Sequence, residues 1–158
     1  VIIGLILILV FMIFYYRGSG FIASTGLIFN LLLVLSILSM LDATLTLPGI
    51  AGLILTVGMA VDANVIIFER IREELEKGKK SKSAVESGFS RAITTIIDAN
   101  VTTILAALIL YQFGSGPIKG FAIVLCCGIL TSMFTAIFTS KTIFNIITNN
   151  KNLKSLSI

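Results

Sequence analysis

Histidine and tryptophan are both absent from the 158 residues of this chain, and only 13% of its residues are charged. The lack of histidine excludes an imidazole metal site, an imidazole general base and an imidazole proton shuttle. The two cysteines, Cys126 and Cys127, are neighbours inside an apolar run, which indicates small core side chains rather than a disulfide or a metal site. We therefore predict no metal, no cofactor and no catalytic centre, in a protein that is not an enzyme.

The low content of charged residues is matched by a high content of apolar residues. Hydrophobic residues make up 56% of the chain, and its mean hydropathy is +1.05. An average soluble domain has about 25% charged residues. A soluble domain of this length could not bury so much apolar surface, so the composition excludes an ordinary cytosolic enzyme, a disordered tail and a disulfide scaffold. The chain is predicted to lie in a lipid bilayer.

Five long apolar segments are each predicted to form a transmembrane helix: residues 1–16, 21–41, 47–68, 92–113 and 118–140. The first is short for a span, as a helix with a truncated start would be. Gly18 and Gly20 indicate a tight link between the first two segments, and Thr46 with Pro48 indicates a helix start. The predicted fold is an all-α membrane protein, a five-helix transmembrane bundle.

Basic residues sort to one side of this bundle. Of the twelve Lys and Arg residues, eleven fall after the first, third or fifth segment, and only Lys119 falls on the opposite side. The positive-inside rule then places the 69–91 loop and the 141–158 tail in the cytoplasm. The net charge of +4 is thus explained by membrane orientation, and we expect no nucleic-acid partner.

The polar stretch 69–91 is predicted to form a cytoplasmic helical hairpin of two short helices. The first carries a Glu73–Lys77 pair four residues apart and stops at Gly78. A capping box from Ser83 to Glu86 is predicted to start the second. This stretch is either a solvated connection between two spans or a contact site for another subunit.

Two aspartates lie inside apolar segments, where a lone carboxylate costs roughly 2.5–3.5 kcal/mol. Asp62 lies seven residues before Glu69, and Asp98 lies seven residues after Arg91. Both are therefore roughly 10 Å inside the apolar region, at one level if the two helices are antiparallel. Without histidine, these carboxylates are the intramembrane groups able to exchange protons near neutral pH. We predict a proton relay; the alternative is a structural role as hydrogen-bond acceptors.

Polar and small residues accompany each aspartate at helical spacing. One face of the fourth segment carries Arg91, Thr94, Thr95, Asp98 and Thr102. In the third segment, the glycines that permit close helix approach are Gly49, Gly52 and Gly58. We predict a hydrated seam between the two helices, in which the relay is supported by Asn64, Asn100, Thr95 and Thr102.

Several motifs resemble the SecD/SecF family of protein-export membrane subunits, and its SecD members in particular: residues 47–52, 58–65, 68–74, 98–103, 114–122 and 131–136. The resemblance extends from about Phe21 to Lys141. Where SecF members have an Asn-Asp-Thr type of motif, this chain has Asp62-Ala63-Asn64.

The resemblance implies an RND-like half of six membrane helices, of which this chain supplies helices two to six; the first helix and an external domain are not in it. It also implies a bacterial inner-membrane subunit that pairs with a SecF half and assists the SecY channel late in preprotein translocation, driven by proton flow. The family's proton-path carboxylate falls on Asp62, and Asp98 falls on a second polar motif. The SecF half is expected to supply a cationic partner for these acids.

Two other functions fit the same residues. One is an RND-type, proton-coupled exporter of small molecules, and the other is a non-conducting membrane scaffold. A scaffold should tolerate Asp62→Asn, whereas either proton-coupled function should not.

Overall fold

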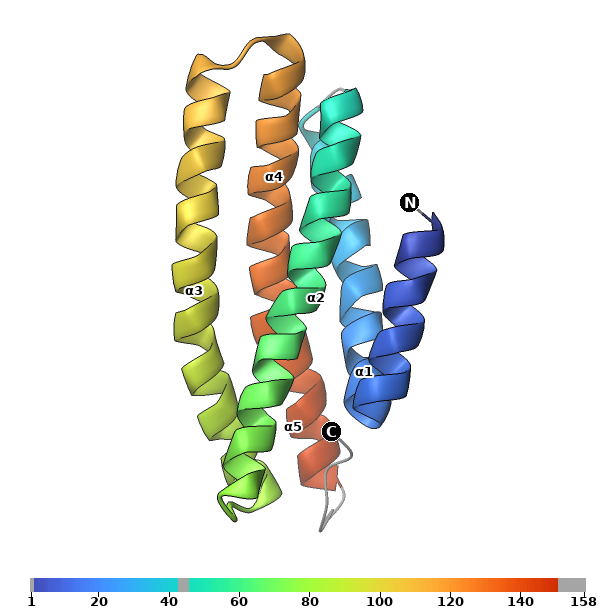
Figure 1. Ribbon diagram of the computed structural model, residues 1–158, viewed down its shortest axis with the longest axis vertical. Coiled ribbons are helices and arrows are strands. Elements are labelled where there is room, and N and C mark those ends of the chain that lie inside the picture. Colours follow the sequence, from blue (N-terminus) through green and yellow to red (C-terminus); the bar gives the residue numbers. More distant parts are fainter. Residues whose placement is uncertain (1, 43–45, 151–158) are drawn as a thin grey trace.

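The computed structural model describes residues 2–42 and 46–150, and every regular element in this part of the chain is helical (Figure 1). The elements are α1 (Ile2–Met40), α2 (Leu47–Glu76), α3 (Ser81–Phe113), α4 (Gly116–Phe134), the π-helix η1 (Thr135–Thr139) and α5 (Ser140–Asn150). Helix α4 packs against α1, α2 and α3 and so forms the centre of the bundle. The all-α fold is confirmed.

Four helical stretches in the described residues are long and apolar enough to cross a membrane, judged by length and composition: Ile6–Met40, Leu47–Glu76, Ser81–Phe113 and Gly116–Ile146. The first of these, in α1, is folded back on itself at Arg17, whose φ of 45° and ψ of −113° break the helix. Figure 1 shows its two arms side by side. A Cβ on Gly20 would collide with the Met12 carbonyl, so the turn between the arms requires glycine there.

Helix α2 begins as the sequence predicts. The Thr46 hydroxyl accepts a hydrogen bond from the Gly49 backbone N–H at 3.2 Å, and Pro48 lies in the first turn, where its missing N–H has no intrahelical role. The same hydroxyl donates to the Pro117 carbonyl at 3.3 Å. The starts of α2 and α4 are therefore tied together.

The two short helices expected within residues 69–91 do not form as separate elements: both stretches are helical, but they are the ends of α2 and α3. Helix α2 continues without a break to Glu76 and α3 begins at Ser81, so four residues connect them. Gly78 reverses the chain with a φ of 81°, as predicted. The predicted capping box is wrong, because α3 already has its N-cap at Lys80 and Ser83 lies inside its first turn.

The polar tail expected at 141–158 begins as a helix instead, since η1 and α5 prolong α4 as far as Asn150. Residues 151–158 lie outside the described part of the chain. Phe144 of α5 is fully buried, and its ring lies 5.7 Å from that of Phe68 and 5.9 Å from that of Phe89. Phe144, with Ile143 beside it, docks this helix on the core, a role that the polar composition of the tail concealed.

Candidate functional site

The packing of α2 against α3 sets the relative heights of the two aspartates. Gly88 of α3 lies directly on Ile71 of α2, and the helices are antiparallel across the turn at 77–80. Asp62 lies nine residues from Ile71, and Asp98 lies ten residues from Gly88 in the matching direction. At 1.5 Å per residue these offsets are about 14 Å and 15 Å. The two carboxylates therefore lie at nearly the same level.

Asp98 lies on the outer face of α3. It is exposed together with the rest of its polar stripe: Arg91, Thr94, Thr95 and Thr102. The buried face of this part of α3 is formed by other residues, among them Ala92, Ile96 and Asn100. The sequence predicted that the two aspartates share one seam between α2 and α3. This prediction is wrong, because Asp98 faces outward.

Asp62 borders an open groove of about 320 Å³ between α2 and α3. Across from it, α3 contributes Asn100 and Thr103, and the remaining walls are mostly apolar. The Asn100 amide donates to the Ile96 carbonyl of its own helix at 2.7 Å, which leaves its side-chain oxygen free of that bond. Of the four predicted supporting residues, Asn100 is the one that lines the groove with Asp62.

Neither aspartate has a hydrogen-bond or ion-pair partner among the described residues. Asn64, by contrast, is buried on the other side of α2. Its side-chain oxygen accepts a hydrogen bond from the Ser140 hydroxyl at 2.9 Å, and its amide donates to the Ala60 carbonyl at 3.0 Å. The geometry assigns Asn64 to the contact between α2 and α5, away from the Asp62 groove.

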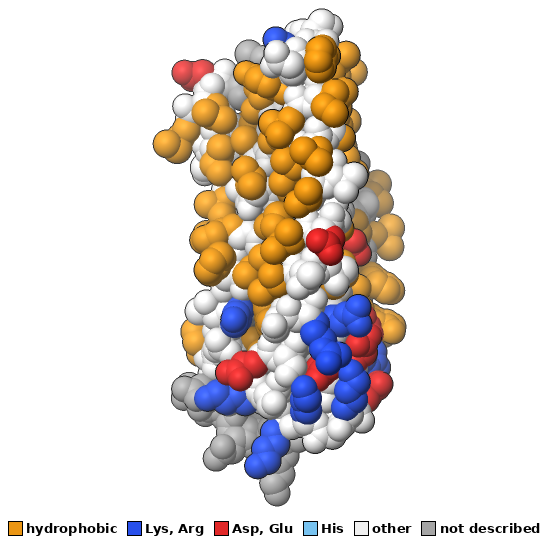
Figure 2. Space-filling model, turned by 90° about the vertical axis from the view of Figure 1, so that its left-hand side faces the viewer, with side chains coloured by type: hydrophobic (Ala, Val, Ile, Leu, Met, Phe, Trp, Pro, Cys, Tyr) orange, Lys and Arg blue, Asp and Glu red, His pale blue; other side chains and the backbone are white. Residues whose placement is uncertain are grey.

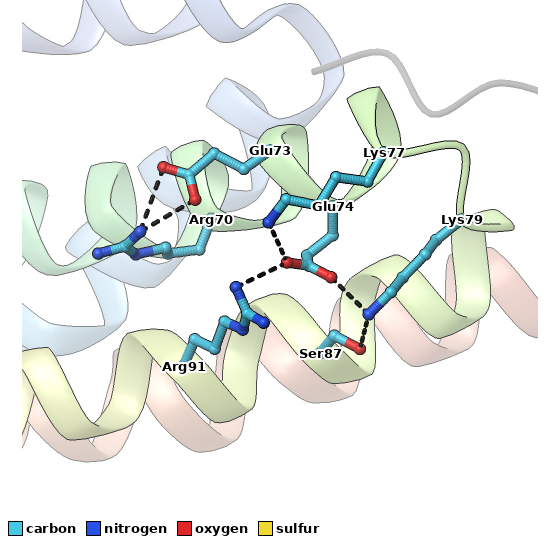
Figure 3. Close-up of polar contacts among 7 residues, drawn as sticks. All are labelled: Arg70, Glu73, Glu74, Lys77, Lys79, Ser87 and Arg91. Atoms are coloured by element: carbon cyan, nitrogen blue, oxygen red, sulfur yellow. Dashed lines mark hydrogen bonds and ion pairs between the residues drawn. The ribbon is translucent and has the colours of Figure 1, made fainter.

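A third acidic residue, Glu74, is satisfied within the chain. It is 1% exposed, and three cations converge on it (Figure 3). Lys77 Nζ lies 2.8 Å and Arg91 Nη1 lies 3.1 Å from Oε1, while Lys79 Nζ contacts Oε2 at 2.5 Å. Hydrogen bonds from Lys77 and Lys79 lower the pKa of Glu74 from 4.5 to about 2.

This cluster corrects the predicted Glu73–Lys77 pair. Glu73 instead pairs with Arg70 at 2.9 Å, and Lys77 turns to Glu74 because the buried carboxylate has the greater need of a counter-charge. The signal for Glu74 was present in the sequence. It falls three residues after Ile71 and seven after Ile67, on the buried stripe of α2.

Figure 2 shows most of the basic side chains of this face gathered at the end of the molecule where α2 passes into α3, below a broad apolar surface.

Residues 1–150 match the family described as protein export membrane protein SecD/SecF, C-terminal. The chain belongs to the SecD/SecF family.

Its similarity to SecD proteins extends over nearly the whole chain. It is 57% identical to protein translocase subunit SecD of Calditerrivibrio nitroreducens over 157 residues, which are 99% of this chain and 30% of that protein. It is 52% identical to SecD of Magnetococcus marinus over 158 residues, which are 100% of this chain and 30% of that protein. The chain thus spans about 30% of the length of these curated relatives.

A solved structure of the family has the same fold. The crystal structure of SecDF, a translocon-associated membrane protein from Thermus thermophilus, matches with a TM-score of 0.92 at 44% identity. The match covers 97% of this chain and 21% of that one.

The glycines of this SecD/SecF chain divide into two groups. A Cβ on Gly49 or Gly52 would lie within 3.5 Å of the Val124 side chain of α4, so both glycines lie at a helix contact. Gly58, also predicted for packing, is exposed, and a Cβ there would have nothing within 4 Å. Sequence reasoning missed Gly128, where a Cβ would collide with Thr56. Within this chain, Gly58 belongs to an open surface.

Proposed function

We propose that this chain is the membrane part of a SecD-type accessory subunit of the Sec protein-export machinery, which uses the proton gradient to assist late preprotein translocation. Family membership, the two SecD relatives and the match to a translocon-associated SecDF support the export role. One observation carries the proton coupling. Asp62 lies in the apolar part of α2, borders an open groove between α2 and α3, and has no hydrogen-bond or ion-pair partner within the described residues. Such a carboxylate marks an ion or proton path.

The proposed topology has five membrane passes, corresponding to helices two to six of an RND-like half. Each arm of α1 crosses once, as do residues 47–68, 92–113 and 118–140. Helix α2 has 30 residues and is about 45 Å long, which exceeds a hydrocarbon core of about 30 Å. Its charged last turns therefore stand beyond the bilayer, on the cytoplasmic side of the bacterial inner membrane by the positive-inside rule.

A SecF half packs over the groove that Asp62 borders and supplies the missing cation. The ionised Asp62 attracts that cation, and protonation removes the attraction. The two protonation states then favour different packings of α2 against the partner, which couples proton flow to movement at the SecY channel and to the preprotein.

The test uses the whole subunit with its SecF half and SecY channel in membrane vesicles. Preprotein translocation is measured with and without a proton gradient. Asp62→Asn keeps shape and hydrogen bonding but cannot titrate, so gradient stimulation should be lost while the SecF half still copurifies. Asp98→Asn is the matched comparison and should be milder, because Asp98 does not line the groove.

Full gradient stimulation in the Asp62→Asn variant would reject the proton relay and favour a scaffold. Loss of translocation both with and without the gradient would point to misassembly, and copurification of the SecF half distinguishes that outcome from loss of coupling.

A further inference from the structure

The Glu74 cluster holds more positive charge than its carboxylate neutralises. Lys77, Lys79 and Arg91 all contact the one carboxylate of Glu74. Of the other acids at the end of α2, Glu73 pairs with Arg70, whereas Glu69 and Glu76 share Arg72 and so leave one negative charge over there. The three cations around Glu74 carry two more positive charges than its carboxylate neutralises, and one positive charge remains when the acids around Arg72 are counted with them; a second anion beside Glu74 would relieve this local excess.

An open cavity of about 340 Å³ lies beside this excess charge. It is lined by Lys79, Arg91, Ser87, Ser90 and Glu86. Lys79 Nζ donates to the Ser87 hydroxyl at 2.9 Å, so the ammonium already bridges Glu74 and the cavity wall. Two cations and two hydroxyls are a donor set that suits the oxygens of a phosphate. With Glu86 included, Glu74 and its three cations retain one excess positive charge.

The height of the cavity matches the headgroup layer of a bilayer. Arg91 directly precedes the apolar part of α3, and Ser87 lies one turn farther out, about 6 Å away. The polar layer on each side of a bilayer is about 5–7 Å thick. The cavity also opens beside the apolar face of α3, where exposed Ile97 and Val101 offer a surface for acyl chains.

We propose that this cavity binds the phosphate of an anionic phospholipid of the phosphatidylglycerol class. Lys79 and Arg91 neutralise the phosphate, Ser87 and Ser90 donate hydrogen bonds to it, and Glu86 restricts the site to a headgroup with a single negative charge. This inference requires only that this end of the bundle lies at a membrane surface. It is independent of protein export and of the Asp62 relay.

The test is native mass spectrometry of the chain released from detergent in the presence of added phosphatidylglycerol. Substituting Lys79 or Arg91 would also disturb Glu74, so the informative variants are Ser90→Leu and Glu86→Gln. Ser90→Leu places an apolar side chain in the cavity wall and removes a donor, and should weaken lipid retention by about fivefold, equivalent to one hydrogen bond of about 1 kcal/mol. Glu86→Gln removes a repelling charge and should strengthen retention by about the same factor.

Ser83→Ala is the matched control, because Ser83 is exposed on the same helix but does not line the cavity; it should retain lipid as the unmodified chain does. Equal retention of phosphatidylethanolamine would overturn the proposal, as would displacement of the lipid by inorganic phosphate at the same concentration. Unchanged retention in both Ser90→Leu and Glu86→Gln would place any bound lipid elsewhere.

Discussion

The charged end of the bundle, where α2 passes into α3, and the exposed part of α2 and α3 that carries Asp62 and Asp98 hold their carboxylates in opposite ways. We call the second region the mid-membrane face, after the topology proposed above. Glu74 at the charged end is buried and holds three cations from its own chain. Asp62 and Asp98, on the mid-membrane face, have no partner among the described residues. An unpaired carboxylate is far more costly in a bilayer than beside water. At the charged end, where water could solvate the carboxylate, Glu74 is neutralised by cations of its own chain. On the mid-membrane face, where water is scarcer, Asp62 and Asp98 have no such cation among the described residues.

The glycines repeat this contrast. Gly88, near the charged end, is packed so closely that a Cβ would lie 2.6 Å from the Ile71 side chain and 2.8 Å from its backbone. Gly58, in the apolar part of α2, has open space around it and lines a groove shared with α1, on the other side of the helix from the Asp62 groove. The charged end is closely packed within this chain, whereas the apolar part of α2 borders open grooves.

The largest stability effect should come from the closed region. Gly88→Ala forces a methyl group into the backbone of Ile71, and we expect a loss of about 1–3 kcal/mol in unfolding free energy. Gly58→Ala, the matched change in the open region, should stay within about 0.5 kcal/mol. Reversible unfolding of both variants in detergent micelles measures the difference. Similar losses in the two variants would mean that Gly58 is already packed within this chain. The contrast between a packed and an open region would then be wrong.

Helical periodicity predicted the members of the α3 stripe but not its direction. Arg91, Asp98 and Thr102 do share one face, as the spacing indicated. In a soluble helix the polar face would point outward by default, whereas in a membrane a polar face is expected to point toward protein. That expectation placed Asp98 toward α2, whereas the structure places it on the outer face of α3.

Helix boundaries were predicted correctly where a single residue determines the backbone conformation. Gly78 and Thr46 mark the helix boundaries that the structure has, because a positive φ and an N-cap hydroxyl are requirements of those two positions. The capping box at Ser83 failed because the chain reverses within four residues, and α3 starts before the box is reached. A motif of four residues contains no information on the length of the connection between α2 and α3.

A smaller stability effect should separate the carboxylates themselves. Glu74→Gln removes the shared partner of Lys77, Lys79 and Arg91, so the chain should melt at a lower temperature. Asp62→Asn removes a charge that has no partner, and its melting temperature should be unchanged or raised. Thermal unfolding followed by circular dichroism in one detergent compares them directly. A lower melting temperature for Asp62→Asn would reveal a stabilising contact of its carboxylate within the chain.

The smallest expected effect, but one whose direction is well defined, is the change in melting temperature as acid protonates Glu74. The pKa of Glu74 is lowered from 4.5 to about 2, chiefly because Lys77 and Lys79 hydrogen-bond to the ionised form. A carboxyl whose pKa is lower in the folded state stabilises the fold fully above its unfolded pKa, and this stabilisation is lost as the pH falls through the folded value. Melting temperature should therefore decline between pH 4.5 and about 2.

Matched variants isolate this contribution from the other carboxylates. Glu74→Gln should flatten the decline, whereas Glu73→Gln should preserve it, because the Glu73 pair with Arg70 is exposed on both sides. The slope should be shallow and should shrink further with added salt, since the side chains of Lys77, Lys79 and Arg91 are themselves 52%, 39% and 58% exposed and water screens them. An acid response that Glu74→Gln leaves unchanged would assign the decline to other groups and show that the closed end does not depend on this carboxylate.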